Sequence, residues 1–423
     1  MQPDHNIATE VLVDIFDLFL YLSMAAGFLM AFSLGANDVA NSMASAVGAR
    51  AITIRQAVII AGTLTFVGAV FLGSHVTATI TRGIINPEHI ADPRIMMLGM
   101  FSALLAASLW VLIASLTALP VSSTHSIVGS ILGFGIVAGG PLVVNWWILS
   151  GVVLSWIISP LFAGTIAFLI FSHIRRYIFF KEHFLQQARN WAPRWIGLTA
   201  LILGYSFIYK TPVGKDLEMT RITAVIVTFL LAICAWYGGR LIINRITRKK
   251  EQSVEEVEGI FRRMQIMTSS YVALSHGAND VANAIGPVAA IYILARQQEL
   301  IQTAEIPLFL LILGGLGLTA GIALLGKKVI ATVGTRITTL TNTRGFAVDF
   351  SAATTVLIAS NMGMPVSTTH ACVGGVTGVG LAGGFSAVNF GVLFRIMGYW
   401  VLTVPITAIT SIVIFQILKW IFI

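Results

Sequence analysis

Long apolar segments separated by short polar connections make up most of the chain. Many of them have about the 20 residues that a helix needs to cross a bilayer, and several are shorter or longer. They lie at residues 12–34, 56–80, 95–118, 121–139, 142–172, 195–209, 221–243, 265–290, 306–326, 346–362, 366–384 and 388–418. This pattern predicts an all-α polytopic membrane protein with about twelve transmembrane elements.

The composition agrees with this pattern. Of the 423 residues, 57% are hydrophobic and 10% are charged, whereas a soluble protein of this size has a larger polar surface. The formal net charge of +8 would by itself be compatible with nucleic-acid binding. Most Lys and Arg residues lie between apolar segments, so they report topology, and we predict a multi-pass protein of the cell inner (plasma) membrane without a nucleic-acid partner.

Basic residues concentrate in alternate connections between the apolar segments. They are Arg50, Arg55, Arg175, Arg176, Lys181, Arg189, those within 240–250, Arg262, Arg263, Lys327, Lys328, Arg336 and Arg344. The connections at 82–94, 210–220 and 296–305 carry mixed or nearly neutral charge. Residues 1–20 contain no Lys or Arg, so we expect an uncleaved first helix rather than a signal peptide. If every segment crosses, both termini lie outside.

Two motifs occur twice in the same order. "GANDVAN" at 35–41 recurs at 277–283, and "PVSSTH" at 120–125 recurs as "PVSTTH" at 365–370. By the sidedness above, the first copy enters the membrane from outside and the second from inside. We therefore predict two inverted-topology repeats, residues 1–172 and 265–423, joined by linker helices and a cytoplasmic loop at 173–264.

Two details of this organisation concern connections and short segments. The polar stretch 240–263 is expected to form a helical cytoplasmic linker. Residues 174–191 have aromatic and basic faces, so they either lie along the inner headgroups or form a plain connector. The glycine-rich segments 121–139 and 366–384 are predicted to be discontinuous helices or re-entrant hairpins, and the sequence leaves open whether they cross fully.

The "GANDVAN" motif places carboxylate and amide groups in lipid. On a helix Asn37, Asp38 and Asn41 can face one neighbour, as can Asn279, Asp280 and Asn283. An ionised Asp costs at least about 2.5–3.5 kcal/mol in the bilayer centre, and neither motif contains a Lys or Arg partner. We assign Asn37, Asp38, Asn279 and Asp280 to sodium binding, with a proton as the alternative cation. An Asp–Asn pair that only packs helices is the alternative, and its duplication disfavours it.

The second motif has the features of a helix start that binds an anion. Proline suits the first turn of a helix, and the hydroxyls and N–H groups that follow suit phosphate or sulfate. Ordinary N-caps are the alternative. The predicted phosphate-binding residues are Ser122, Ser123, Thr124, Ser367, Thr368, Thr369, Asn41 and Asn283. Because these groups supply only partial charges, a cation held by Asp38 and Asp280 would complete the neutralisation of the anion.

Three further polar residues are possible auxiliaries. His125 and His370 could bind the anion or move a proton, or could be core histidines that fix the hairpins. Asp349 could contribute to a cation site on one side, or pair with Arg344. The residues alone leave these alternatives open.

At these motifs the sequence resembles the inorganic phosphate transporter (PiT) family. "GANDVANSMASAVG" and "GANDVANAIGP" match the duplicated family signature, and the paired P-V-S-x-T-H segments match its second pair. The resemblance covers nearly the whole chain and implies two inverted repeats around a central site. It implies uptake of phosphate driven by sodium or protons, and the short central loop is similar to that of prokaryotic members.

The leading hypothesis is therefore a secondary active symporter that imports inorganic phosphate with sodium by alternating access. Alternatives are a proton-coupled phosphate or sulfate permease, an intramembrane enzyme and a channel. No nucleophile–base pair is evident, so we predict no enzyme activity, and no cofactor besides the co-transported cation. The stoichiometry and the oligomeric state, including a homo-oligomer, stay open.

Overall fold

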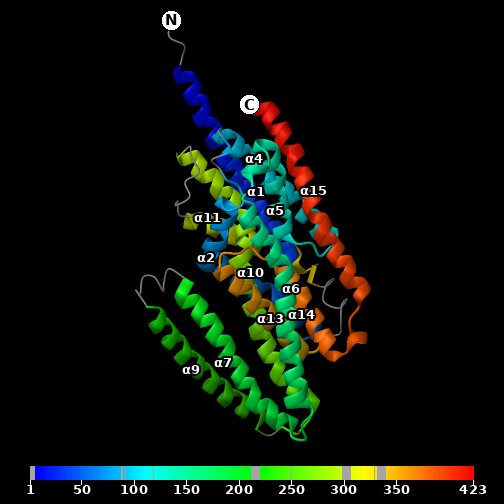
Figure 1. The fold of residues 1–423 in the computed structure, drawn as a ribbon. Coiled ribbons are helices and arrows are strands. Elements are labelled where there is room, and N and C mark those ends of the chain that lie inside the picture. Colours follow the sequence, from blue (N-terminus) through cyan, green and yellow to red (C-terminus); the bar gives the residue numbers. More distant parts are fainter. Residues whose placement is uncertain are drawn as a thin grey trace.

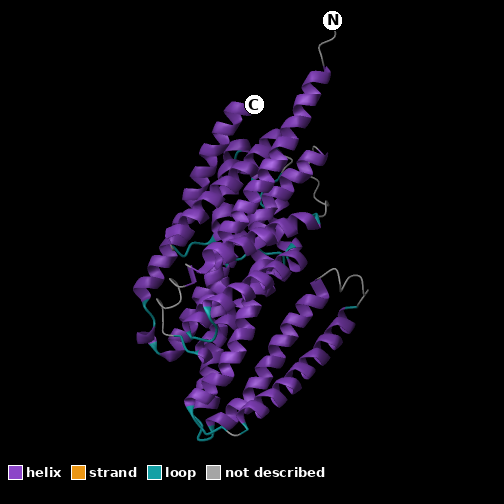
Figure 2. Ribbon diagram, turned by 180° about the vertical axis from the view of Figure 1, so that it is seen from behind, coloured by secondary structure: helices purple, strands orange, loops and turns teal. Residues whose placement is uncertain are grey.

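The computed structural model describes residues 5–86, 89–90, 92–117, 119–210, 220–248, 250–297, 306–327, 329–330 and 340–423. Helices account for almost all of the regular structure in this part of the chain (Figures 1 and 2). The α-helices of the first half are α1 (His5–Gly48), α2 (Ile54–Leu72), α3 (Ser74–Arg82), α4 (Pro93–Thr117), α5 (Ser123–Gly139), α6 (Trp146–Ile174) and α7 (Phe184–Lys210). They are followed by α9 (Arg221–Thr247), α10 (Val254–Gln297), α11 (Leu308–Gly321), α13 (Asn342–Asn361), α14 (Thr368–Gly383) and α15 (Phe390–Phe422).

The apolar segments predicted most of these helices but not the length of two of them. α1 and α10 each have 44 residues, well beyond the apolar segments 12–34 and 265–290. Both helices run straight through the polar "GANDVAN" motif, because its side chains find partners inside the protein. The predicted segment 56–80, in contrast, is divided at Gly73 into α2 and α3.

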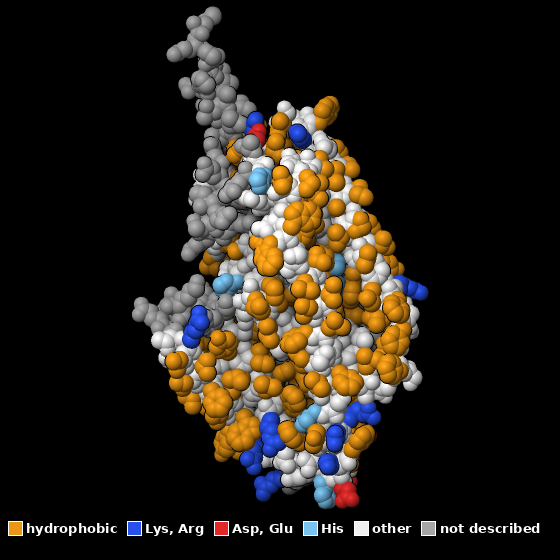
Figure 3. Space-filling model, in the orientation of Figure 1, with side chains coloured by type: hydrophobic (Ala, Val, Ile, Leu, Met, Phe, Trp, Pro, Cys, Tyr) orange, Lys and Arg blue, Asp and Glu red, His pale blue; other side chains and the backbone are white. Residues whose placement is uncertain are grey.

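Eight of the described helices are long and apolar enough to cross a bilayer. The number of actual crossings stays a prediction. Large apolar side chains cover the middle of the face seen in Figure 3, and Lys and Arg side chains gather mostly at its lower end. In the same orientation, the start of α1 and the end of α15 lie together at the opposite end (Figure 1). Which side of the membrane that end faces stays a prediction, and Lys328, Arg336 and most of the connections 210–220 and 296–305 lie outside the described residues.

Both connecting segments are divided by breaks, and only the stretch 240–263 differs in this from the expectation. The stretch 240–263 is not one linker helix: α9 ends at Thr247, and α10 begins at Val254. Residues 174–191 likewise divide into a π-helical turn Arg175–Phe179 at the end of α6 and the start of α7. α7 and α9 pack against each other as a hairpin beside the bundle (Figure 1). One break lies between α6 and this hairpin, and the other lies between the hairpin and α10.

The segments that follow the two "PVS-x-TH" motifs have the same construction. α5 and α14 end at glycines with positive φ, Gly140 at 77° and Gly384 at 122°, and each is followed by a short 3₁₀ turn. Asn145 and Asn389 then cap α6 and α15, accepting hydrogen bonds from the N–H three residues on. The sequence repeat is thus a repeat of local structure, from Ser122 to Asn145 in one half and from Ser367 to Asn389 in the other.

Helices from the two halves pack in exchanged pairs. α2 packs on α10 and α11 on α1, while α5 packs on α15 and α14 on α6. Glycines permit the closest of these approaches: a Cβ on Gly35 would collide with the carbonyl oxygen of Leu318 in α11, and one on Gly277 with that of Thr65 in α2. The first letter of "GANDVAN" therefore serves backbone contact between halves in both copies.

Candidate ion and anion site

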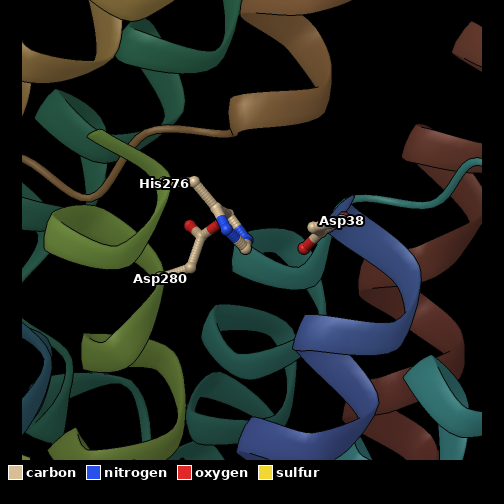
Figure 4. Close-up of side chains that lie close together, drawn as sticks. All are labelled: Asp38, His276 and Asp280. Carbon is tan, nitrogen blue, oxygen red and sulfur yellow. The ribbon is translucent and has the colours of Figure 1, made fainter. Parts of the chain in front are cut away.

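The two "GANDVAN" segments lie near the middle of the protein, within α1 and α10. Asp38 and Asp280 are completely buried. The carboxylates of both and the imidazole of His276 offer atoms that all lie within 4.8 Å of one another, and Figure 4 shows the three side chains converging from two helices. The structure therefore brings the two predicted acidic residues together in one cluster.

In the first half, Asp38 accepts hydrogen bonds from Ser123 and Asn41, both of which the sequence analysis assigned to the site. The hydroxyl of Ser123, at the start of α5, donates to Oδ2 of Asp38 at 3.0 Å. Asn41 Nδ2, one turn further along α1, donates to Oδ1 at 3.2 Å. The carboxylate thus joins the signature helix to the N-terminus of the short helix α5.

In the second half, Asp280 is held in a similar way. Thr368 Oγ1, at the start of α14, donates to Oδ2 of Asp280 at 3.1 Å. The other oxygen accepts from Asn279 Nδ2 at 2.6 Å, and the same amide nitrogen also donates to the carbonyl of Val366 at 2.7 Å. Asn279 is fully buried, while its counterpart Asn37 is 7% exposed, so the two amides have different surroundings.

Reciprocal hydrogen bonds cross between the halves. Asn41 Nδ2 donates to Thr369 Oγ1 at 2.9 Å, and Asn283 Nδ2 donates to Thr124 Oγ1 at 3.4 Å. The two threonines in turn donate across the centre to carbonyl oxygens, Thr124 to Val366 at 3.1 Å and Thr369 to Val121 at 3.3 Å. The N-termini of α5 and α14 therefore meet at the same place as the two carboxylates.

Ser122 and Ser367 occupy the N-cap positions of these short helices. Each side-chain oxygen accepts a hydrogen bond from the backbone N–H three residues on, that of His125 at 3.3 Å and that of His370 at 3.2 Å. The other N–H groups of each first turn have no acceptor within the helix, and the helix dipoles make this region positive. Such a pair of N-termini can bind an oxyanion, and the assignment of these hydroxyls to phosphate stays a prediction.

His276 is a site residue to which the sequence analysis assigned no role. Its Nε2 lies 3.0 Å from Oδ2 of Asp280, one helical turn away, and its side chain is buried. The sequence analysis considered only Lys and Arg as basic partners of the acidic residues, whereas the structure places a histidine beside Asp280. The available signal was the residue before the motif, which is histidine in "SHGANDVAN" and Leu34 in "SLGANDVAN".

His125 and His370 bind the opposite half of the protein. Nδ1 of His125 donates to the carbonyl of Trp400 in α15 at 3.0 Å, and Nδ1 of His370 donates to the carbonyl of Trp156 in α6 at 2.9 Å. Each imidazole also lies against an indole, with centroids 3.7 Å apart in the pairs His125–Trp156 and His370–Trp400. These contacts agree with the alternative in which both are core histidines, which hold α5 and α14 in place.

Asp349 lies apart from the central cluster. Its carboxylate accepts hydrogen bonds from Ser45 at 2.6 Å and from Ser269. Ser45 follows Asp38 by seven residues, which is about 10 Å along α1. The guanidinium of Arg344 lies over the ring of Phe171, with 5.4 Å between Cζ and the ring centroid, so serines rather than Arg344 are the partners that the structure gives to Asp349.

This geometry can be compared with known proteins. Residues 34–411 match the model of the phosphate transporter family. The chain belongs to this family. The match spans both "GANDVAN" motifs and both "PVS-x-TH" motifs, and it confirms the prediction of a membrane transporter of phosphate rather than an enzyme.

Individual relatives cover almost the entire chain. A putative phosphate permease of Pyrococcus abyssi is 49% identical over 96% of this chain and 99% of that protein. A putative phosphate permease of Haemophilus influenzae is 37% identical over 95% of this chain and 97% of its own length. A solved structure described as the sodium-dependent phosphate transporter is 47% identical, covers 96% of this chain and 100% of that one, and superposes with a TM-score of 0.91.

Proposed function

We propose that this protein imports inorganic phosphate together with sodium ions by alternating access between two inverted repeats. The observation that carries the proposal is the meeting of two buried carboxylates, Asp38 and Asp280, with the N-termini of α5 and α14. The similarity to a sodium-dependent phosphate transporter supports the choice of cation.

The negative charges of the two carboxylates and of a phosphate beside them require bound cations. Two carboxylates within 4.8 Å and removed from water repel each other strongly, and a phosphate placed beside them would add to the negative charge. Sodium ions bound by carboxylate, amide and hydroxyl oxygens would offset both. Phosphate and sodium would thus stabilise each other's binding, which is the basis of coupling.

The membrane potential makes the same coupling useful. Phosphate at neutral pH carries about one to two negative charges, and an inside-negative potential opposes its entry by about 2.3 kcal/mol per charge for each 100 mV. Two sodium ions moving with each phosphate would cancel or reverse this opposition. Asp38 and Asp280, one from each repeat, are the residues to which we assign these ions.

The exchanged helix packing supports a mechanism of alternating access. Symmetry-related contacts such as Asn41–Thr369 and Asn283–Thr124 surround one central site with equivalent groups from both halves. A central site between related repeats can be opened to either side by the movement of one part against the other. The repeats would comprise residues 1–172 and 265–423.

The test is uptake of labelled phosphate by the purified protein in liposomes. Separate inward gradients of sodium and of protons are imposed, with and without an excess of sulfate. We expect the sodium gradient to drive uptake, and sulfate to compete weakly. Uptake that follows the proton gradient and ignores sodium would overturn the assignment of the cation, and strong competition by sulfate would overturn that of the anion.

A further inference from the structure

We infer that a groove between α6, α14 and α15 binds one anionic phospholipid, with an acyl chain in the groove and the phosphate at Arg175 and Arg344 beyond its end. The bound lipid holds α14 in place and thereby increases the rate of transport. The binding does not depend on the proposed function, whereas the effect on transport rests on it.

The groove suits an apolar occupant. Its volume is about 380 Å³, which is within the range of sites that bind small molecules. The side chains along it come from all three helices and include Leu161, Phe168, Thr377, Leu381, Met397 and Trp400. Almost all of this lining is apolar, and the hydroxyls of Thr165 and Thr377 donate to carbonyl oxygens of their own helices at 2.8 Å. A polar ligand would find few partners here, whereas an acyl chain would be removed from water.

The groove also opens to the outer surface of the helix bundle. α14 lies beside α6 (Figure 1), and α6 and α15 are among the helices that are long and apolar enough to cross a bilayer. At the edge of the groove Leu161 is 66% exposed, Phe168 40% and Met397 43%. Large apolar side chains are exposed in this way where they face lipid. An acyl chain can therefore enter sideways from the bilayer.

Two arginines lie just beyond one end of the groove. Leu381, the last lining residue of α14, precedes Ala382, whose carbonyl oxygen accepts a hydrogen bond from the guanidinium of Arg175. Cζ of Arg344 lies 5.4 Å from the ring centroid of Phe171, about one turn of α6 beyond the last lining residue of that helix. Arg175 has no carboxylate partner among the described residues. Guanidinium groups beside an apolar groove match the phosphate and the acyl chain of one phospholipid.

Trp400 connects the groove with the central site. Its indole lines the groove and stacks on the imidazole of His370, with ring centroids 3.7 Å apart. His370 belongs to the first turn of α14, as does Thr368, which donates to Asp280 at 3.1 Å. An acyl chain between α14 and its neighbours would keep this first turn in position. We therefore expect the bound lipid to speed uptake by orienting the hydroxyl that holds Asp280.

The corresponding positions of the other half carry larger side chains. Seven residues after the motif histidine, Thr377 corresponds to Leu132, and nine residues after the tryptophan, Thr165 corresponds to Ile409. A double variant, Thr165→Ile with Thr377→Leu, copies the other half and fills part of the groove. Because each excluded methylene lowers affinity about fourfold, lipid binding should fall by about tenfold or more. Thr410→Ile is the matched control, since its hydroxyl also donates within its own helix and it lies outside the groove.

The binding test measures lipid retained by the purified full-length protein in native mass spectrometry. Phosphatidylglycerol and phosphatidylcholine with identical acyl chains are added in equal amounts, and we expect one phosphatidylglycerol retained per chain. Arg175→Gln should lower the preference for phosphatidylglycerol by about fivefold, whereas Arg240→Gln, at an exposed position of α9, should leave it unchanged. Equal retention of both lipids by the wild type, or a dimer that retains neither, would overturn the inference.

Fluorescence quenching tests the location of the acyl chain. Phosphatidylglycerol with brominated acyl chains quenches tryptophans that it touches. The quenched signal should decrease in Trp400→Phe but not in Trp156→Phe, since Trp156 stacks on the other motif histidine and does not line the groove. An equal decrease in both variants would contradict the assignment to this groove.

Transport measurements separate this inference from the proposed function. Sodium-driven uptake of labelled phosphate is compared in liposomes of phosphatidylcholine with and without phosphatidylglycerol. We expect phosphatidylglycerol to raise the maximal rate for the wild type and for Thr410→Ile, but not for the double variant. Lipid retention without any sodium-driven uptake would overturn the proposed function alone. Uptake that responds to phosphatidylglycerol equally in the double variant, or not at all in the wild type, would overturn this inference alone.

Discussion

The two copies of "GANDVAN" are identical in sequence but differ in their surroundings. Asp38 is bonded to a serine and to Asn41, whereas Asp280 is bonded to a threonine and to its neighbour Asn279 and has His276 beside it. The hydrogen bond from Asn41 to Thr369 in α14 is 2.9 Å long, and the one from Asn283 to Thr124 in α5 is 3.4 Å long. Identical letters therefore specify the same backbone packing, while the flanking residues decide the chemistry of each copy.

The strongest test of this comparison removes one charge at a time. Asp38→Asn and Asp280→Asn should each reduce sodium-driven phosphate uptake to the level of protein-free liposomes, because the one remaining carboxylate cannot hold the two sodium ions that neutralise the phosphate. Asp92→Asn is a suitable control, since Asp92 pairs with Arg94 in a partly exposed ion pair at 2.8 Å. Wild-type uptake by either signature variant would contradict the assignment of the cations.

Backbone packing should be equally sensitive in both copies. Gly35→Ala and Gly277→Ala place a methyl group against the carbonyl oxygens of Leu318 and Thr65, so each should lower the free energy of unfolding by about 3 kcal/mol. Thermal unfolding in detergent measures this loss. Gly151→Ala and Gly238→Ala, whose added Cβ would meet no atom within 4 Å, are the matched controls and should not destabilise the protein.

The hydroxyls that donate to the carboxylates should have a smaller effect. Ser123→Ala and Thr368→Ala each leave a buried carboxylate one donor short, at a cost of about 1–3 kcal/mol. The sequence analysis assigned these two hydroxyls to phosphate, but in the structure both donate to the carboxylates. We therefore expect this cost in the sodium concentration for half-maximal uptake more than in the phosphate KM. Ser130→Ala is the control, since its hydroxyl donates to the carbonyl oxygens of Ser126 and Thr407 and not to a carboxylate. A change confined to the phosphate KM would instead assign the hydroxyls to the anion.

The smallest expected effect concerns His125 in α5 and His370 in α14. His125→Leu and His370→Leu each lose one hydrogen bond to a tryptophan carbonyl and should cost about 1 kcal/mol of unfolding free energy. Their rings lie 4.6 Å apart, so the double variant should depart from the sum of the single ones by about 0.5 kcal/mol or more. Unfolding of the three variants in detergent tests both statements. Strict additivity would show that the two contacts are independent.

Much of the fold and part of the site could be predicted from the sequence. The apolar segments and the duplicated motifs predicted the helices, and the spacing of Asp38 and Asn41 predicted their common face. The contacts between halves could not be predicted, because they depend on which helices pack together. His276 was missed for a related reason: a histidine in an apolar helix has no local pattern that distinguishes a core residue from a residue of the site, and only its contact with Asp280 does so.

Helix lengths were underestimated where polar residues interrupt an apolar segment. The signature motif lowers the hydropathy in the last third of α1 and near the centre of α10, and Glu255, Glu256 and the bases near 262 lower it at the start of α10. α1 and α10 continue through the signature motifs because contacts inside the protein satisfy the polar groups there, whereas Glu255, Arg262 and Arg263 are exposed at the start of α10. Hydropathy describes the lipid-facing surface, and it underestimates helices whose polar side chains point inward.

The exchanged helix pairs have a consequence for a protein that is expressed as two separate fragments. If the chain were cut at residues 248–253, each fragment would keep its own signature helix but lose the helix that seats the signature glycine, α11 for one fragment and α2 for the other. Neither fragment could then fold alone, and co-expression of the two should restore the assembly. The intervening connection is thus dispensable as a tether, provided that both pieces are synthesised into the same membrane.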